Sequence, residues 1–217
     1  MGHGKASAMV ALGALALAAQ AFAAPAFFPV RLAAAVMLEL PGDWTVVEGG
    51  PRDRPETRVR SLARSGGDVD ATSQRRFAAD DYDDAGRVAA RIEVRYDPGR
   101  SVSQAEVEDA TDYEISRVDK AMRAAVEKSA TRLGVSVLEW KGTERRDLHG
   151  TTGFVSEYRR SPWRDNGVFV VKMLRVLDGP QSFTVTLSYR EDEGARLRPL
   201  CERILASVRR TPAGSPS

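Results

Sequence analysis

The chain has 217 residues, of which 42% are hydrophobic and 29% charged, and a formal net charge of +2. This length suits one well-cored domain, and the composition excludes a multispan membrane protein, a collagen-like repeat and wholesale disorder. The small net charge supplies no field of one sign that would hold nucleic acid non-specifically, so no nucleic-acid partner is expected.

The start of the chain has the parts of a secretory signal peptide. A short basic beginning ends at Lys5, a run of apolar and small residues covers Ala6–Ala19, and Ala21-Phe22-Ala23 supplies the small residues that a signal peptidase requires. We therefore predict a Sec-type signal peptide at residues 1–23, cleavage after Ala23, and a periplasmic or secreted protein. The apolar run is shorter than the roughly 20 residues of a membrane-spanning helix, so the mature chain is expected to have no transmembrane segment.

The first part of the mature chain has weak signals. Residues 24–30 contain two prolines and predict an extended leader, whereas residues 31–40 predict a first strand. The segment Leu40-Pro41-Gly42-Asp43-Trp44 is typical of a tight turn that returns Trp44 to a sheet. Residues 48–86 are rich in Arg, Asp, Gly and Pro, and predict a charged, partly mobile insertion with one strand candidate at Thr57–Ala63.

Regular structure resumes after the insertion. Apolar and charged residues alternate from Arg87 to Tyr96, which indicates a strand with one buried face. A long helix follows, because Ser103-Gln104-Ala105-Glu106 is a capping box and apolar residues recur at helical steps from Val107 to Leu133.

Four further strands and a helix complete the predicted domain, which spans residues 31–209. The strands are expected at 135–146, 152–160, 168–177 and 182–189, and both faces of 168–177 are apolar, so this strand should be central. The last helix is expected from about Pro199, and residues 210–217 are expected to form a disordered tail. Hairpin-length connections favour an α+β fold in which an antiparallel β-sheet is flanked by a long mid-chain helix and a C-terminal helix, as an α/β/α sandwich.

This pattern resembles the superfamily of PsbP-like and Mog-like α/β/α sandwich domains, which occur in photosystem II extrinsic proteins, a Ran-binding nuclear factor and many small exported bacterial proteins. The resemblance rests on Leu40-Pro41-Gly42-Asp43-Trp44, on the mid-chain helix, and on the closing hairpin followed by Ile204-Leu205-Ala206-Ser207-Val208. It covers most of the mature chain, and its motifs describe turns and core faces. It implies a non-enzymatic adaptor or binding module, and it assigns no site residue.

Two residues could carry catalysis. Cys201 lies on the apolar stripe of the last helix, where a thiol packs as a small hydrophobic group, and as the single cysteine it can form no internal disulfide. His149 is the one histidine after the signal peptide, and Asp147-Leu148-His149-Gly150 predicts a turn without a nucleophile-elbow sequence. No catalytic residue is predicted, and a hydrolase using His149 is kept as a second alternative function.

The acidic run Asp80-Asp81-Tyr82-Asp83-Asp84 offers carboxylate oxygens for calcium. It lacks the spacing of a calcium-binding loop, so a solvated acidic loop is favoured, and calcium binding there is left open. One histidine and one cysteine on separate elements cannot form an ordinary zinc site. We therefore predict no metal and no cofactor.

Two regions are candidates for partner binding. Arg58 and Arg60 would share one face of the strand candidate and could meet phosphate, acidic polysaccharide or an acidic protein, or could keep an edge strand soluble. Arg160, Trp163 and Arg164 lie on a connecting loop, where Trp163 could anchor an interface or pack beneath the loop.

The sequence therefore predicts an exported non-enzymatic binding or accessory module of the bacterial cell envelope, whose partner is a protein or an anionic envelope component. The alternative is a periplasmic carrier of a small apolar ligand or lipid, with a cavity between the long helix and the sheet. The oligomeric state is left open.

Overall fold

The computed structural model describes residues 25–32, 36–47, 57–64, 76–97, 101–162 and 167–210. Of Thr57, Arg58 and residues 62–64, only the backbone is described. The predicted signal peptide, most of the charged insertion and the predicted tail beyond Arg210 lie outside these residues.

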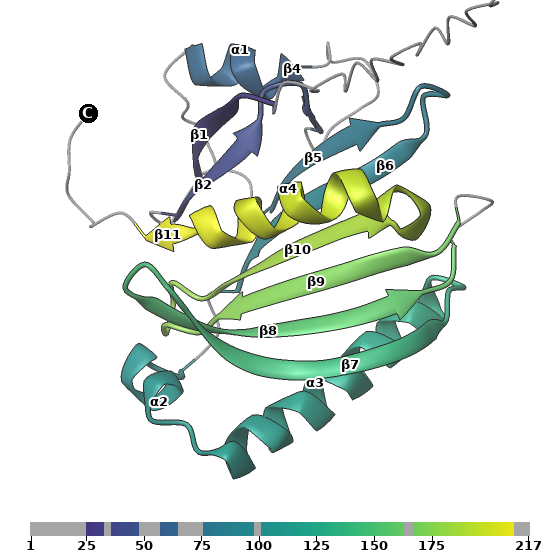
Figure 1. Ribbon diagram of the computed structural model, residues 1–217. Coiled ribbons are helices and arrows are strands. Elements are labelled where there is room, and N and C mark those ends of the chain that lie inside the picture. The colour runs from purple at the N-terminus through teal and green to yellow at the C-terminus, as the bar shows by residue number, and fades with distance from the viewer. Residues whose placement is uncertain are drawn as a thin grey trace, which may run out of the picture.

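Within the described segments, the main sheet has eight strands in the order β4-β3-β5-β6-β10-β9-β8-β7 (Figure 1). All neighbouring strands in it are antiparallel, as the hairpin-length connections predicted. The strands are β3 (Thr45–Val46), β4 (Thr57–Arg58), β5 (Arg76–Tyr82), β6 (Val88–Tyr96), β7 (Val137–Leu148), β8 (Thr151–Arg160), β9 (Phe169–Val176) and β10 (Phe183–Arg190).

A second, three-stranded sheet joins the two ends of the described chain in the order β1-β2-β11. Its strands are β1 (Phe27–Leu32), β2 (Val36–Pro41) and β11 (Arg209–Arg210). The predictions of a leader at residues 24–30 and of one strand at residues 31–40 were wrong, because β1 and β2 pair with each other over six residue pairs. Alternate residues of both strands enter the core, and this burial outweighs the prolines that favoured a leader.

Four α-helices lie among the described residues: α1 (Val59–Arg64), α2 (Gln104–Glu108), α3 (Asp112–Arg132) and α4 (Gly194–Ser207). Figure 1 shows α4 crossing one face of the main sheet, over β10, whereas α3 passes behind β7 at one end of the sheet. The fold is therefore α+β with a helix on each face of an antiparallel sheet, as predicted.

The predicted mid-chain helix is divided in two. Its capping box at Ser103 is confirmed, because the Ser103 hydroxyl accepts from the Glu106 amide and the Glu106 carboxylate accepts from the Ser103 amide. A second capping box, between Thr111 and Glu114, starts α3 after a short break. Backbone hydrogen bonds to these caps lower the pKa of both Glu106 and Glu114. The sequence carries the Thr-x-x-Glu signal for the second start, which the continuous apolar periodicity obscured.

The last helix begins before the position predicted from its proline. Helix α4 begins at Gly194 and contains Pro199, which has no backbone N–H to donate to Ala195. Both residues lie on the exposed side of the helix, where water can satisfy the Ala195 carbonyl. The prediction of regular helix only from about Pro199 was therefore wrong.

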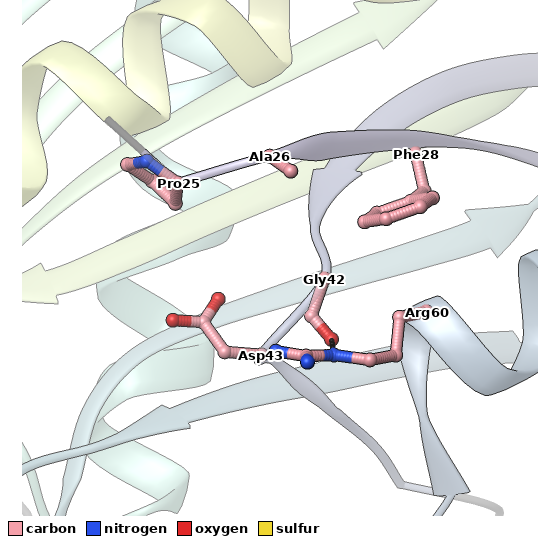
Figure 2. Close-up of a pocket in the computed structure, with 6 residues that line it drawn as sticks. All are labelled: Pro25, Ala26, Phe28, Gly42, Asp43 and Arg60. Atoms are coloured by element: carbon pink, nitrogen blue, oxygen red, sulfur yellow. Dashed lines mark hydrogen bonds between the residues drawn. The ribbon is translucent and has the colours of Figure 1, made fainter. Parts of the chain in front are cut away.

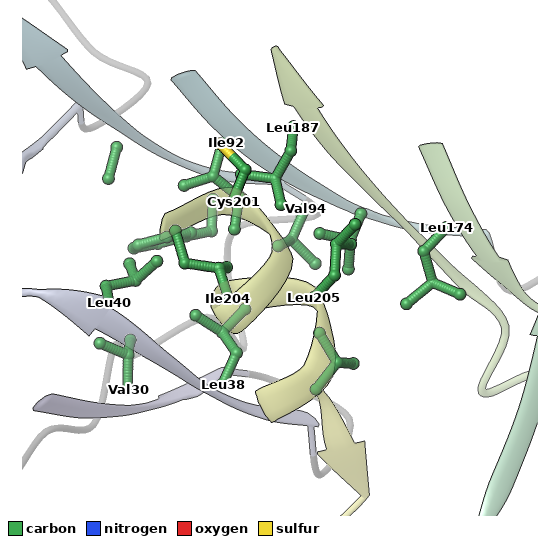
Figure 3. Packing of buried hydrophobic residues seen from close by; sticks show 14 of the residues in the cluster. Val30, Leu38, Leu40, Ile92, Val94, Leu174, Leu187, Cys201, Ile204 and Leu205 are labelled. Carbon is green, nitrogen blue, oxygen red and sulfur yellow. The ribbon is translucent and has the colours of Figure 1, made fainter. Parts of the chain in front are cut away.

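Helix α4 forms the centre of the apolar core (Figure 3). Its side chains Cys201, Ile204 and Leu205 are fully buried and lie between the two sheets, with Leu38 of β2 on one side and Leu187 of β10 on the other. The prediction that Cys201 packs in the core is confirmed. Burial raises the pKa of the Cys201 thiol to about 12, so the thiol stays protonated at neutral pH.

The prediction that strand 168–177 is central and covered on both faces is confirmed by β9. Val170 and Leu174 of this strand face α4 in the core, whereas Phe169 and Val171 are buried on the opposite face. On one side of β9, β8 lies between it and the edge strand β7.

The charged insertion contains more regular structure than its composition predicted. Thr57–Ala63 was expected as a strand, but only Thr57 and Arg58 are in a strand, and α1 begins at Val59. The acidic run was expected as a solvated loop, but Asp80 and Asp81 are buried residues of β5. Pairing with β6 holds Phe77 and Ala79 in the core, and this long-range contact overrides the local composition.

We expect Ile204→Ala to lower the free energy of unfolding by about 2–5 kcal/mol, because it leaves a cavity between two packed sheets. Leu133→Ala is the matched control: Leu133 is 53% exposed, so its truncation should change the free energy of unfolding by less than about 0.5 kcal/mol. Urea denaturation of both variants measures the difference. Equal and small effects would contradict the position of α4 between the sheets.

Candidate functional site

Arg160 lies at the end of β8, and its side chain contacts neighbouring residues of the same chain. Its guanidinium stands 4.6 Å from the centre of the Phe169 ring, and its Nη1 donates to the Ser161 carbonyl at 3.3 Å. Burial lowers the pKa of this guanidinium. The other two candidates of this loop, Trp163 and Arg164, lie outside the described residues.

The structure does not place Arg58 and Arg60 on one strand face, so that prediction was wrong. Arg58 belongs to β4, where its backbone pairs with Thr45, and only its backbone is described. Arg60 lies exposed on α1, and its Nε donates to the Gly42 carbonyl at 3.2 Å. This bond joins the helix to the turn between β2 and β3.

A small pocket of about 190 Å³ lies at this turn (Figure 2). Its polar wall is formed by Asp43 and Arg60, and Phe28 provides an apolar wall. A side chain at Gly42 would clash with the Phe28 ring, which occupies the space that a Cβ would need. The turn predicted at residues 40–44 is confirmed, because the Trp44 amide donates to the Pro41 carbonyl at 3.3 Å and Trp44 is 1% exposed.

The face of the main sheet that points away from α4 carries a row of polar residues across four strands. Arg76 of β5 is opposite Arg95 of β6, Arg95 is opposite Thr184 of β10, and Thr184 is opposite Arg175 of β9. We call these four residues the arginine row. The sequence showed the polar face of β6, but residues 48–86 were expected as an insertion, so the partner strand of Arg95 was missed.

One carboxylate serves two arginines of the row. The Glu93 carboxylate lies 2.5 Å from Arg76 Nη2, and it also accepts from Arg95 Nε. Burial raises the pKa of Glu93, but the hydrogen bonds from Arg76 and Arg95 outweigh this effect, so that the pKa is lowered and the carboxylate stays ionised. Glu93 is therefore a fixed negative charge between two cations.

Arg175, at the other end of the row, contacts a different part of the fold. Its Nη2 lies 3.1 Å from the Asp97 carboxylate, and its Nη1 lies 3.3 Å from the sulfur of Met122 on α3. The row therefore runs from β5 across β6 and β10 to β9, where Arg175 contacts α3.

Asp80 and Asp81 occupy neighbouring positions on β5 and face opposite sides of the sheet. Asp80 is 3% exposed, and its Oδ1 lies 3.6 Å from Arg91 Nε and has no hydrogen-bond partner among the described residues. Asp81 lies 2.9 Å from Arg196 of α4. Burial is the largest effect on each carboxyl and raises its pKa, although the neighbouring arginine lowers it.

A second charged cluster lies where α4 borders the main sheet. Lys172 of β9 is 8% exposed, and its Nζ lies 3.0 Å from the Glu157 carboxylate and also contacts Glu202 of α4. Lys141 of β7 lies 2.7 Å from Glu157. Every charge in this cluster has an opposite partner, so its arrangement suits the attachment of α4 to the sheet.

His149 lies at an exposed two-residue turn between β7 and β8. Its φ is 39° and that of Gly150 is 83°, as the tight hairpin turn requires. This confirms the predicted turn. The structure does not bring His149 together with a serine hydroxyl or a carboxylate in any hydrogen bond between described residues.

Comparison with known proteins connects this chain to others by fold. No family model and no curated protein matches it. The solution structure of cyanobacterial PsbP (CyanoP) from Synechocystis sp. PCC 6803 superimposes with a TM-score of 0.52 at 14% sequence identity, covering 88% of this chain and 96% of that chain.

Two further solved structures overlap more loosely. A protein of unknown function from Pseudomonas aeruginosa gives a TM-score of 0.42 at 13% identity and covers 86% of this chain and 99% of that chain. LpqN of Mycobacterium tuberculosis, described as involved in cell envelope biogenesis, gives 0.37 at 14% identity, covering 86% and 91%. We take the fold from CyanoP alone: the chain has a PsbP-like fold, as the sequence resemblance predicted.

The helices of the described segments include none with both the length and the apolar character needed to cross a membrane.

We expect Asp80→Asn to raise the free energy of unfolding at pH 7. The folded-state pKa of Asp80 is raised above its ordinary value of 3.8, so the protonated form stabilises the fold below that value and this contribution is lost as the pH rises through the folded pKa. Asparagine imitates the protonated form at every pH. The gain should therefore shrink as the pH falls from about 7 to about 4.

Urea denaturation across this pH range measures the effect, and Asp84→Asn at an exposed turn position is the control. A loss of stability in Asp80→Asn at pH 7 would mean that attraction to Arg91 outweighs the burial of the charge.

Proposed function

We propose that this protein is an exported, non-enzymatic binding or accessory module of the bacterial cell envelope whose partner docks on its surface. One observation carries the proposal: the long helix α3 lies directly against the sheet. Trp140 Nε1 of β7 donates to the Asp119 carboxylate at 2.8 Å, and the sulfur of Met122, which is 5% exposed, lies 3.3 Å from Arg175 of β9. The layer between α4 and the sheets is filled as well, since Cys201 is 0% exposed. A ligand carrier would instead keep a cavity open between the long helix and the sheet.

The pocket at Gly42 also supports surface recognition over the alternative of an apolar carrier. Its volume of about 190 Å³ is below the range of roughly 300–1,000 Å³ that is usual for small-molecule sites. Asp43 and Arg60 line it, so its walls offer charge rather than a continuous apolar surface. A pocket of this kind suits a single side chain of a partner.

The positions of Cys201 and His149 support a non-enzymatic role. The thiol of Cys201 lies in the core with its pKa raised to about 12, and a reactive cysteine needs a thiolate with access to solvent. His149 lies at a hairpin turn, where its conformation serves the backbone. The hydrolase alternative predicts that His149→Ala abolishes hydrolysis of its substrate. Our proposal predicts that the same variant binds the partner as well as the native protein does.

The compartment is tested by fractionation of the native host and N-terminal sequencing. We expect the mature protein in the periplasm or the medium, beginning at Ala24, because the first residues have the pattern that a signal peptidase recognises. A protein that retains Met1 or Gly2 would overturn the exported function.

The mode of binding is tested in the native envelope by photo-crosslinking. Benzoylphenylalanine replaces Tyr82 of β5 or Tyr113 of α3, which are 40% and 72% exposed, so that an aromatic residue is exchanged for an aromatic residue. We expect a discrete crosslinked protein from one position and not the other, because a docking partner covers one face.

Lipid extraction of the protein purified from the same host is the parallel measurement. A lipid bound in equal amount to the protein, together with the absence of any protein crosslink from both positions, would establish the carrier function instead. The candidates Trp163 and Arg60 are examined as alanine variants in the same assay, and a role in docking predicts a weaker crosslink.

A further inference from the structure

Arg76 and Arg95 are an unfavourable pair by the rules of sheet formation. They stand directly opposite each other on neighbouring antiparallel strands, where like charges destabilise a sheet. Glu93 is shared between them, so one carboxylate faces two guanidinium groups. This part of the sheet therefore lacks one negative charge, and such local conflicts in a sequence are expected at functional sites.

The two arginines are also open to solvent. The Arg76 and Arg95 side chains are 56% and 61% exposed, whereas that of Glu93 is 15% exposed. Each guanidinium has five N–H donors in a flat fork, and the two oxygens of Glu93 cannot occupy all of them. Both forks therefore keep donors for a further carboxylate, which they can bind with two parallel hydrogen bonds.

The arginine row has the geometry of a linear site. Neighbouring strands lie about 4.8 Å apart, so the row from Arg76 through Arg95 and Thr184 to Arg175 spans about 14 Å. Figure 1 shows β5 and β6 away from the end of the sheet that α3 occupies. A row of this length across strands suits four or five residues of an extended chain, whose side chains reach the face at every second position.

The mixture of charges favours a protein segment over a uniform polyanion. The arginine row and the adjoining Asp80–Arg91 pair contain four arginines, and the carboxylates Asp80, Glu93 and Asp97 lie among them. One net positive charge gives little attraction to an anionic lipid surface, which responds to the number of unpaired cations. Fixed carboxylates among the cations instead select a partner whose own charges have a matching order.

We propose that the arginine row is the docking surface for an extended acidic segment of a partner protein, whose carboxylates bind Arg76 and Arg95 beside Glu93. This inference rests on the binding function proposed above and names its surface and the chemistry of its partner.

The test uses a fluorescently labelled eight-residue peptide of alternating Glu and Thr, with a Gln-Thr peptide as its neutral counterpart. We expect the mature protein to bind the acidic peptide in preference, with an affinity that falls as salt rises. Arg76→Gln/Arg95→Gln should weaken binding about tenfold or more, because two charge-assisted contacts are lost. Fluorescence anisotropy measures each affinity.

Arg117→Gln/Arg132→Gln is the matched control, since it removes the same charge from exposed positions of α3. It should leave the affinity within about twofold. Arg76→Lys/Arg95→Lys keeps the charge without the forks and should give an intermediate affinity. Thermal melting shows whether each variant is folded, so a loss of binding in a folded variant is attributable to the site.

Three results would overturn the inference: no preference of the native protein for the acidic peptide, equal losses in the two Gln variants, or stronger binding through Arg76 and Arg95 to phosphatidylglycerol vesicles than to the peptide. The last would identify a lipid surface as the ligand.

The crosslink from Tyr82 separates this inference from the proposed function. If the partner still crosslinks to Arg76→Gln/Arg95→Gln at full yield, the binding function stands and the arginine row is not its surface.

Discussion

The fold depends on the burial of α4 between two sheets. Each sheet has an apolar face that must be covered by another element. Helix α4 covers both faces, because its side chains Ile204 and Leu205 fill the space between Leu38 of β2 and Leu187 of β10. Hydrogen bonds fix the helix in this place: the Ser207 hydroxyl accepts from the Glu39 amide at 2.8 Å and donates to the Ile204 carbonyl at 2.7 Å. The chain then adds β11 to β2, which joins the two ends of the described part of the chain.

This use of the apolar surface limits where the proposed partner could dock. The side of the main sheet that faces α4 is committed to packing, and the Lys172 cluster at its margin is internally neutralised. The opposite side is covered by α3 at the β7 end, while β5 and β6 carry Arg76 and Arg95 with most of their side chains in solvent. A surface that binds through ionic contacts is therefore compatible with a filled interior, and the two need not compete for the same residues.

The sequence predicted the elements whose own residues bear a regular pattern. Alternation gave β6 and β8–β10, and the apolar stripe gave the core position of Cys201. The prediction from sequence failed where pairing with distant strands decides the structure. The acidic residues around Asp80 favoured a loop in place of β5, and the prolines favoured an extended leader in place of β1. The same limit applies to the site. Arg60 and Arg160 stand out by composition, but the arginine row exists only through the register of β5, β6, β10 and β9, which no local pattern encodes.

The most direct test of this account is chemical-shift mapping of the backbone amides during titration with the acidic peptide. The account predicts that the perturbed amides cluster on β5, β6 and β10 around Arg76, Arg95 and Thr184, while amides of α4 and of the exposed side of α3 do not shift. Perturbations centred on the Gly42 pocket, or spread over all exposed arginines without a centre, would contradict it.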